Sequence, residues 1–311
     1  MLSSQVVNSY RFAVAGGSKG IFAGGMNPAG GGTTFSEIEY IIIVTLTGNT
    51  SVFGDLVEAR GYNAGVHNDT RGCFMGGYPP TATGVTYNRG LLIDYITMAT
   101  TSNATVFGET TYARYGGASV NSDTRGCLCG GYGATGGDQD IIDYITIAIT
   151  GDATNFGDLS RGTRYSAGVS SDTRGCIALG GVSASNEIEY ITIASTGNSS
   201  DFGDLTEAQH YLAGCSDGSR GVYGGGYNNT DLIQYITIAS TGNATNFGDL
   251  NTGTAGLTGI ADDTYGVFAG GVTPSTDLMQ YITIQSTGNA SVFGDLSHAT
   301  SGMGGVSEGV V

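Results

Sequence analysis

The strongest constraint on the fold of this chain is an internal repeat that covers most of its length. The segment Tyr-Ile-Thr-Ile-Ala-Ser-Thr-Gly-Asn occurs identically at 190–198 and at 235–243, and four close copies occur elsewhere in the chain. Each copy leads to a Phe-Gly pair, and the six phenylalanines are Phe53, Phe107, Phe156, Phe202, Phe247 and Phe293. Their spacing of 45 to 54 residues predicts one structural unit per copy.

Each repeat is predicted to contain four short β-strands, which we call A, B, C and D in chain order. Strand C is the Tyr-Ile-Thr-Ile-Ala segment, and strand D lies near Phe-Gly-Asp-Leu. Strand B is an apolar run that ends in Gly-Gly, and it follows a turn that is usually Asp-Thr-Arg-Gly. Strand A precedes that turn, as at 165–169. No stretch shows the apolar period of a helix. Because strand C is apolar on both faces, we predict an all-β, six-bladed β-propeller with four-stranded antiparallel blades.

The repeat boundaries define a single domain over 1–311. We place the blades at approximately 10–56, 57–108, 109–159, 160–205, 206–250 and 251–296, with a C-terminal tail strand at 297–311. Strand A occurs a seventh time, because Tyr10–Val14 aligns with 165–169 and a weaker copy, 302–306, ends the chain. We expect the N-terminal copy to complete blade one. The C-terminal copy would then lie across the seam or add to a neighbouring subunit's edge, and the reverse assignment stays open.

Composition and charge exclude several classes of partner. The chain has 27 acidic and 11 basic residues, a formal net charge of −16, which disfavours nucleic acid and anionic membranes. Neither a signal peptide nor a segment long enough to span a membrane is recognised. The 55 glycines would suggest disorder, but the 40 % hydrophobic residues and the placement of glycine at strand ends favour a fold.

The order of turn, apolar run, Gly-Gly, variable loop, tyrosine-containing strand and late aromatic residue resembles the kelch repeat, over roughly 10–306. Many kelch copies carry an arginine near the first strand, and Arg60, Arg114 and Arg164 match. Kelch copies usually have a late tryptophan, and this chain has phenylalanine there and no tryptophan. The wording of the copies also resembles kelch-like repeats in virion structural proteins of marine cyanobacterial phages. That resemblance implies a component of a phage particle, made in the host cytoplasm and located in the virion.

Residues that recur in every blade are interpreted as structural. Eight basic residues fall at two repeat positions, and we expect them to pair in turns and between blades with recurrent aspartates. The basic residues are Lys19, Arg71, Arg125, Arg174 and Arg220 in the A–B turn and Arg60, Arg114 and Arg164 before strand A; the aspartates are Asp55, Asp158, Asp204, Asp249 and Asp295. A ring of anion-binding arginines is the alternative, which the net charge disfavours. The asparagines of five Asn-x-Ser/Thr sequences in the C–D turns are interpreted as turn residues.

The sequence predicts no catalytic residue, metal or cofactor, so the protein is not expected to be an enzyme. One aspartate per blade falls short of the converging oxygens that Ca²⁺ requires. Cys73, Cys127 and Cys176 occupy a position that is valine or isoleucine in other blades, which indicates core packing. The three histidines, His67, His210 and His298, occupy different repeat positions and form no predicted ligand set.

The variable loops are the predicted binding site. A–B and C–D turns would form a constant face, whereas B–C loops and D–A connections would form a variable face, where rigid scaffolds usually carry function. The candidate ligand-binding residues are Tyr78, Tyr87, Asn88, Arg89, Tyr132, Tyr227, Asn228 and Asn229.

We expect a non-enzymatic decoration, tail-fibre or host-contact protein that presents these loops to a glycan or protein. Its other partners would be virion proteins or copies of itself, reached through the constant face or the C-terminal tail. The alternatives are a cytoplasmic kelch-type interaction module and a propeller-scaffold enzyme. The loops could also be solvent-exposed segments without a ligand.

Overall fold

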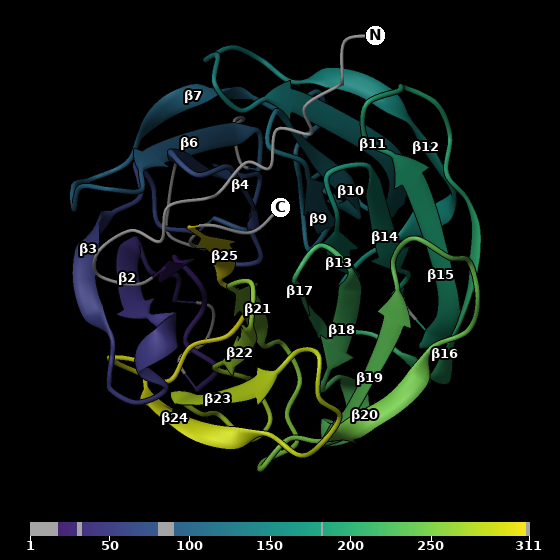
Figure 1. Ribbon diagram of the computed structural model, residues 1–311. Helices are drawn as coiled ribbons and strands as arrows, with labels where there is room; N and C mark the ends of the chain where they lie inside the picture. The colour runs from purple at the N-terminus through teal and green to yellow at the C-terminus, as the bar shows by residue number, and fades with distance from the viewer. Residues whose placement is uncertain (1–17, 30–32, 80–89, 182, 309–311) are drawn as a thin grey trace, which may run out of the picture.

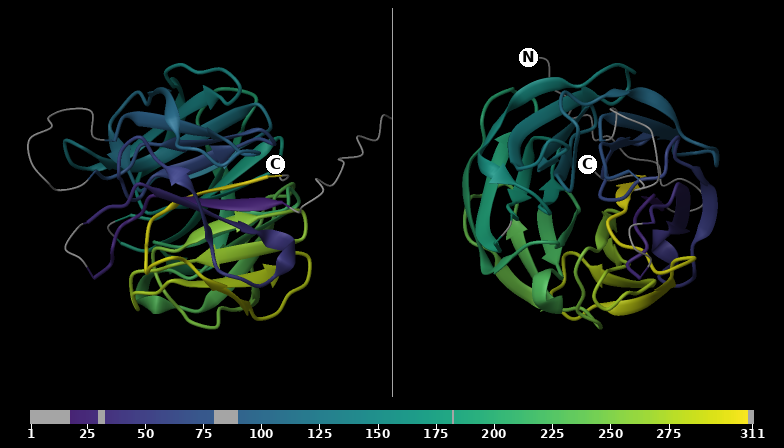
Figure 2. Two further views of the ribbon diagram at one scale, coloured as in Figure 1. Left: turned by 90° about the vertical axis from the view of Figure 1, so that its left-hand side faces the viewer. Right: turned by 180° about the vertical axis from the view of Figure 1, so that it is seen from behind.

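The computed structural model describes residues 18–29, 33–79, 90–181 and 183–308 as an all-β ring. Six antiparallel sheets surround a central axis and form a six-bladed β-propeller, as the sequence predicts (Figure 1). Side and rear views show that the blades form a closed, thick disc (Figure 2). In the described segments no helix is long and apolar enough to cross a membrane.

Each blade contains one inner strand and three further strands toward the rim. Blade one comprises β25 (Gly304–Ser307), β1 (Lys19–Ala23), β2 (Glu37–Ile42) and β3 (Ser51–Asp55). Blade two comprises β4 (Ala64–His67), β5 (Arg71–Met75), β6 (Leu92–Thr97) and β7 (Thr105–Glu109). Blade three comprises β9 (Ala118–Asn121), β10 (Arg125–Gly133), β11 (Asp138–Thr146) and β12 (Thr154–Thr163), and β8 (Arg114–Tyr115) also pairs with β10.

The other three blades follow the same order. Blade four comprises β13 (Ala167–Ser170), β14 (Arg174–Ala178), β15 (Ser185–Thr192) and β16 (Ser200–Gln209). Blade five comprises β17 (Ala213–Ser216), β18 (Arg220–Gly224), β19 (Leu232–Thr237) and β20 (Thr245–Asp249). Blade six comprises β21 (Thr258–Ala261), β22 (Tyr265–Ala269), β23 (Leu278–Thr283) and β24 (Ser291–Asp295). Within the described residues, the helical elements are two short 3₁₀ turns, η1 (Ile43–Thr45) and η2 (Tyr227–Asn229).

The C-terminal strand, not the N-terminal copy, completes blade one. Strand β25 pairs antiparallel with β1, with Ala23 opposite Gly304 and Gly20 opposite Ser307. The expectation that Tyr10–Val14 would fill this position, with the C-terminal copy across the seam or on a neighbouring subunit, is wrong, and the C-terminal copy follows the reverse assignment. Residues 1–17 lie outside the described segments.

The inner position of blade one leaves little space for a side chain. A Cβ at Gly304 would lie 2.0 Å from Asn63 Oδ1, and one at Gly305 would lie 2.8 Å from the Gly259 carbonyl oxygen. The N-terminal copy offers Phe12 and Ala13 at these two places. A side chain at the first of these places would require Asn63 to move.

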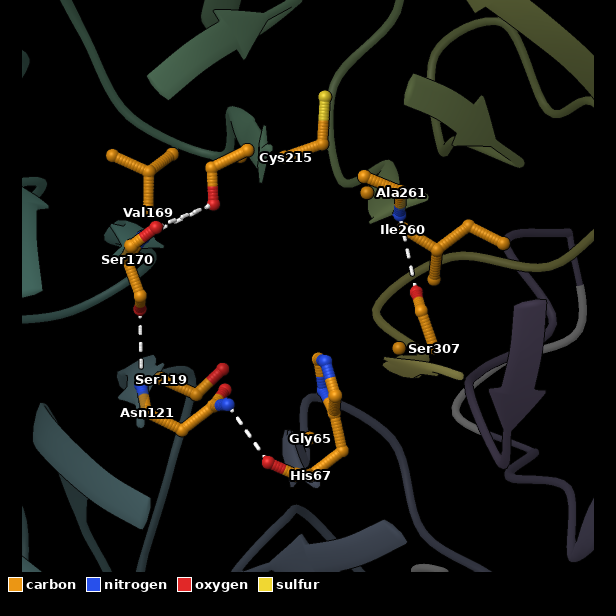
Figure 3. A pocket seen from close by; sticks show the side chains of 15 residues that line it. Gly65, His67, Ser119, Asn121, Val169, Ser170, Cys215, Ile260, Ala261 and Ser307 are labelled. Atoms are coloured by element: carbon orange, nitrogen blue, oxygen red, sulfur yellow. Dashed lines mark hydrogen bonds between the residues drawn. The ribbon is translucent and has the colours of Figure 1, made fainter. Parts of the chain in front are cut away.

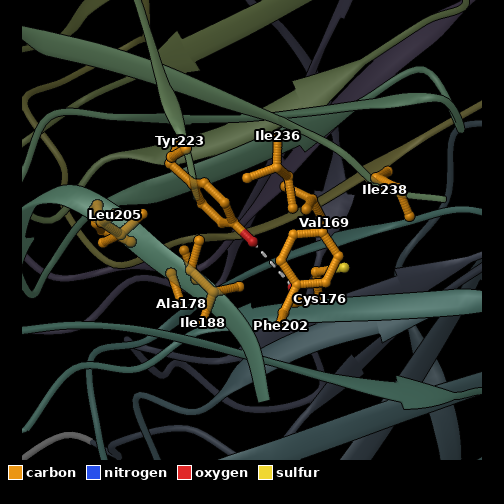
Figure 4. Close-up of a cluster of buried hydrophobic side chains, with 12 residues drawn as sticks. Val169, Cys176, Ala178, Ile188, Phe202, Leu205, Tyr223, Ile236 and Ile238 are labelled. Carbon is orange, nitrogen blue, oxygen red and sulfur yellow. Dashed lines mark hydrogen bonds between the residues drawn. The ribbon is translucent and has the colours of Figure 1, made fainter. Parts of the chain in front are cut away.

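Both faces of the sheets are buried, as the apolar strands predict. One core cluster joins Ala178 and Ile188 of blade four to Tyr223 and Ile236 of blade five (Figure 4). The Tyr223 hydroxyl donates to the Cys176 carbonyl at 3.2 Å. All five cysteines are buried free thiols, and this confirms the core position predicted for Cys73, Cys127 and Cys176. Burial raises the pKa of the Cys73, Cys127 and Cys176 thiols to about 12, so these thiols stay protonated.

The arginines of the A–B turn do link neighbouring blades, but their partners differ from those expected. Arg71 stacks over Tyr95 of its own blade at 4.3 Å and donates to the Ile147 carbonyl of the next blade at 3.0 Å. The same two contacts recur at Arg125, Arg174 and Arg220. Backbone carbonyls, not the recurrent aspartates, therefore receive these cations. In blade six Tyr265 occupies the arginine position.

The buried arginines Arg60 and Arg114 also pair with aspartates other than those expected. Each forms a 2.9 Å ion pair with a strand C carboxylate, Asp94 and Asp143 respectively.

The C–D turn asparagines link the blades along the rim. Asn198 Oδ1, for example, accepts the Asp158 N–H of the preceding blade at 3.1 Å.

Candidate functional site

A closed ring of six backbone hydrogen bonds surrounds the axis on the variable face. The residue two positions before each inner strand takes part in this ring. Its N–H donates to the carbonyl of the corresponding residue in the preceding blade at 2.5–2.9 Å. The six residues are Tyr62, Gly116, Tyr165, Tyr211, Gly256 and Gly302. All six have positive φ values, between 54° and 74°. The ring therefore requires left-handed backbone in every blade.

Tyrosine is an unexpected residue in this ring. Left-handed backbone costs an L-residue with a Cβ on the order of 1–2 kcal/mol, whereas glycine adopts it freely. Glycine serves blades one, three and six, so the same turn needs no side chain there. Tyr62, Tyr165 and Tyr211 nevertheless occupy it in blades two, four and five. Strained backbone held in place by its surroundings is typical of functional sites.

The three tyrosine rings cover the end of the axis and contact one another. Tyr165 and Tyr211 stack with centroids 3.8 Å apart and planes 18° apart, and Tyr62 meets Tyr165 edge-on at 5.4 Å. The rings also use the space that the glycines leave, because a Cβ at Gly302 would lie 2.5 Å from Tyr62 and one at Gly116 would lie 2.9 Å from Tyr165. We call this group of three tyrosines the axial mouth.

Further aromatic residues extend the axial mouth in two directions. Tyr115 contacts Tyr165 at 6.4 Å, Tyr78 at 5.0 Å and Tyr132 at 5.6 Å. The guanidinium of Arg164 lies 4.5 Å from the centroid of the Tyr132 ring. In the other direction His210 contacts Tyr211 at 5.2 Å and Tyr227 at 4.5 Å. The surface runs over blades two to five, and its Tyr227 end is half exposed.

Burial favours the neutral form of five rings of this surface, those of Tyr62, Tyr115, Tyr165, His210 and Tyr211. Burial raises the pKa of Tyr62 and of Tyr211 to about 12, and it raises the pKa of Tyr115 and Tyr165 well above the ordinary value. Burial also lowers the pKa of His210, which keeps the imidazole uncharged. The site therefore offers aromatic faces and phenolic hydroxyls, with Arg164 as its cation.

The space beneath the axial mouth is small. Two cavities of about 80 and 110 Å³ follow the axis below the tyrosines. A third, of about 80 Å³, lies near the constant face, where Asn121, Ser170, Ser216 and Ser307 form hydrogen bonds between inner strands (Figure 3). Drug-sized ligands need roughly 300 Å³ or more. A ligand larger than a few waters must therefore bind on the surface of the mouth.

The structure brings some of the sequence-predicted residues to this surface. Tyr78 and Tyr132 meet through Tyr115, and Tyr227 lies at the opposite end beside His210, with Asn228 and Asn229 exposed next to it. Tyr87, Asn88 and Arg89 lie outside the described residues.

Sequence reasoning missed the central tyrosines and Arg164. Arg164 stands one residue later than Arg60 and Arg114 relative to the ring position. It therefore reaches Tyr132 and, at 3.2 Å, Asp138 at the start of β11, not the strand C position that Asp94 and Asp143 occupy. The signal that could have revealed the tyrosines is the alternation of tyrosine and glycine in one repeat column.

In the described part of the chain, one group of side chains could hold a metal ion. Glu37, Glu39 and His298 place their ligand atoms within 4.8 Å of one another at the junction of blades six and one.

A scan against models of known protein families found no match to this chain, and a search of curated proteins found none either. The fold alone therefore defines the class, a six-bladed β-propeller.

Proposed function

We propose that this chain is a kelch-like, non-enzymatic structural and binding protein of a phage particle, and that it presents the axial mouth to a glycan. One observation carries the binding proposal: three tyrosines occupy left-handed backbone where glycine serves the same turn in three other blades. A residue that is kept at such a cost, and in only some of the blades, contributes through its side chain. The phage assignment is supported by the resemblance of the repeats stated above.

A sugar matches the chemistry of the mouth. The C–H face of a pyranose ring packs on an aromatic face, and hydroxyl groups at its edge pair with phenols. The Tyr165–Tyr211 stack, Tyr62 and Tyr227 supply the aromatic faces, and Arg164 and Asn228 supply donors beside them. The net charge of −16 disfavours a strongly anionic ligand. A propeller repeated on an oligomeric particle would convert weak single-site binding into avidity.

The decisive variants are Tyr165→Gly and Tyr211→Gly. Glycine retains the left-handed turn and relieves its strain while the aromatic ring is lost, so we expect the melting temperature to change little and the variants to lose glycan binding on an array of bacterial surface glycans. Asn289→Ala, on the rim, is the matched control and should bind as the wild type does. Strong destabilisation with binding retained would show that the tyrosines are structural.

The particle assignment has its own test. Mass spectrometry of purified virions should detect the chain, and a reconstruction of the particle should show the constant face buried and the axial mouth exposed. A buried mouth would replace host contact with a cementing role. Absence from virions, together with capture of a defined protein by the mouth, would favour a cytoplasmic interaction module.

A further inference from the structure

One position of strand C has the same hydrogen-bonding role in every blade. Its side chain accepts the backbone N–H of the connection that arrives from the preceding blade. Asp94 accepts from Val57 at 2.9 Å, and Gln234 accepts from Thr206 at 2.7 Å. The six residues at this position are Glu39, Asp94, Asp143, Glu189, Gln234 and Gln280, all of them buried. Four blades therefore place a carboxylate in a site from which most water is excluded.

Blades two and three compensate these carboxylates with arginine, and blade four has an arginine beside the neighbouring glutamate. Asp94 and Asp143 have Arg60 and Arg114 at 2.9 Å. In blade four Glu189 is accompanied by Glu187, and Arg161 pairs with Glu187 at 2.7 Å. Blades five and six use neutral glutamine. Blade one repeats the two glutamates of blade four, as Glu37 and Glu39, but has His298 where blade four has Arg161.

We propose that Glu37, Glu39 and His298 bind a divalent transition-metal ion, with Zn²⁺ as the reference ion. His298 Nδ1 lies 3.6 Å from Glu37 Oε2 and 4.0 Å from Glu39 Oε1. Ligands of a tetrahedral zinc ion, each about 2.0–2.1 Å from the metal, lie about 3.3 Å from one another. The two distances from His298 would therefore have to shorten by about 0.3 and 0.7 Å, and Ser297 Oγ, which contacts all three side chains, would have to turn away. One imidazole and two carboxylates suit Zn²⁺ better than Ca²⁺, which takes six to eight oxygens.

The surroundings hold two of the three ligands in place. Glu39 has 9 % of its side chain exposed, and its Oε2 accepts the Ser297 N–H at 3.1 Å. The imidazole of His298 packs on Phe35 with ring centroids 4.0 Å apart. Ser297 Oγ lies 2.6 Å from His298 Nδ1, a contact that metal binding would replace. The ion would supply the positive charge that Arg161 supplies in blade four.

The ion would fasten the seam where the ring closes. Glu37 and Glu39 belong to blade one, whereas His298 lies on the connection that leads from β24 to the closing strand β25. Binding to the folded state alone would stabilise that closure. This site is independent of the glycan proposal, since it uses none of the residues of the axial mouth.

The test is titration of the full, EDTA-treated chain with Zn²⁺ by calorimetry, and with Co²⁺ by visible absorption. We expect one ion per chain, a tetrahedral Co²⁺ spectrum and a higher melting temperature with Zn²⁺. His298→Arg recreates blade four, so it should fold without metal and bind Zn²⁺ at least 100-fold more weakly. His67→Asn, which copies Asn121 of blade three, should bind as the wild type does.

Glu37→Gln provides a second readout at the more exposed ligand and should also weaken Zn²⁺ binding. Absence of saturable 1:1 binding would overturn the proposal and leave His298 as an ion-pair partner only. Equal Zn²⁺ affinity in the wild type and His298→Arg would overturn it as well.

Discussion

At the seams between blades one set of contacts is repeated around the ring, whereas at the axial mouth neighbouring blades differ. Arg71, Arg125, Arg174 and Arg220 each stack on a tyrosine and donate to the next blade. The ring position at the mouth changes between tyrosine and glycine although its backbone is the same. In a repeat protein, recurrence therefore identifies the scaffold, and a costly departure from it identifies a candidate site.

Loss of the closing strand should have the largest effect on stability. Deletion of 304–311 removes β25 and exposes the edge of β1 and the core around Val306. We expect a loss of more than about 4 kcal/mol, or no folded ring at 25 °C, measured by urea denaturation.

The matched control for that deletion removes residues 1–14, which contain the other strand A copy. Because β25 already fills the inner position of blade one, this deletion should cost much less. Equal losses from the two deletions would contradict the assignment of the closing strand.

The next largest effect is expected at a buried charge pair of the seam. Arg114→Thr leaves Asp143 buried without its cation, which should cost about 3–5 kcal/mol in urea denaturation. Arg114→Thr with Asp143→Gln copies blade six, where Thr254 and Gln280 occupy these positions. The double variant should come within about 1 kcal/mol of the wild type. A double variant as unstable as the single one would show that blades three and six are not equivalent.

A rim contact should matter less. Asn243→Ala removes the acceptor for the Asp204 N–H, a single exposed hydrogen bond of 3.0 Å. We expect a loss of about 0.5–1.5 kcal/mol in thermal or urea unfolding. Thr241→Ala, in the same exposed turn, is the control and should change stability by less than about 0.5 kcal/mol.

The smallest effect on stability is expected at the edge of the mouth. Tyr227 is 50 % exposed, and Tyr227→Ala should change the free energy of unfolding by less than about 0.5 kcal/mol while weakening glycan binding. A loss as large as that of Arg114→Thr would break the comparison, because the mouth would then be part of the scaffold.

The repeat made the architecture predictable because each blade reports the same pattern again. The strands, the turns and the six-bladed ring follow from the repeat itself. The buried cysteines follow from the shared repeat position of Cys73, Cys127 and Cys176. Partners across blades were less predictable. The A–B turn arginines were expected to meet aspartates, but the nearest acceptors are backbone carbonyls, whose position depends on how one blade packs on the next.

The candidate site was predictable in some of its residues but not in its centre. Tyr78, Tyr132 and Tyr227 were proposed from loop variability, since the repeat shows directly which loops vary. Tyr62, Tyr165 and Tyr211 are separated by 103 and 46 residues in the chain. They meet only because the inner strands converge on the axis.

The sequence by itself determined the number of blades, the strands within each blade and the apolar character of both sheet faces, because these depend on local pattern and period. Tertiary structure decided which terminus closes blade one, which groups receive the arginines, and that aromatic residues from blades two to five form one surface. Each of these depends on distances across the axis or across a seam. A Cβ at Gly304, for example, would lie 2.0 Å from Asn63, and the sequence pattern of a single repeat does not show this contact.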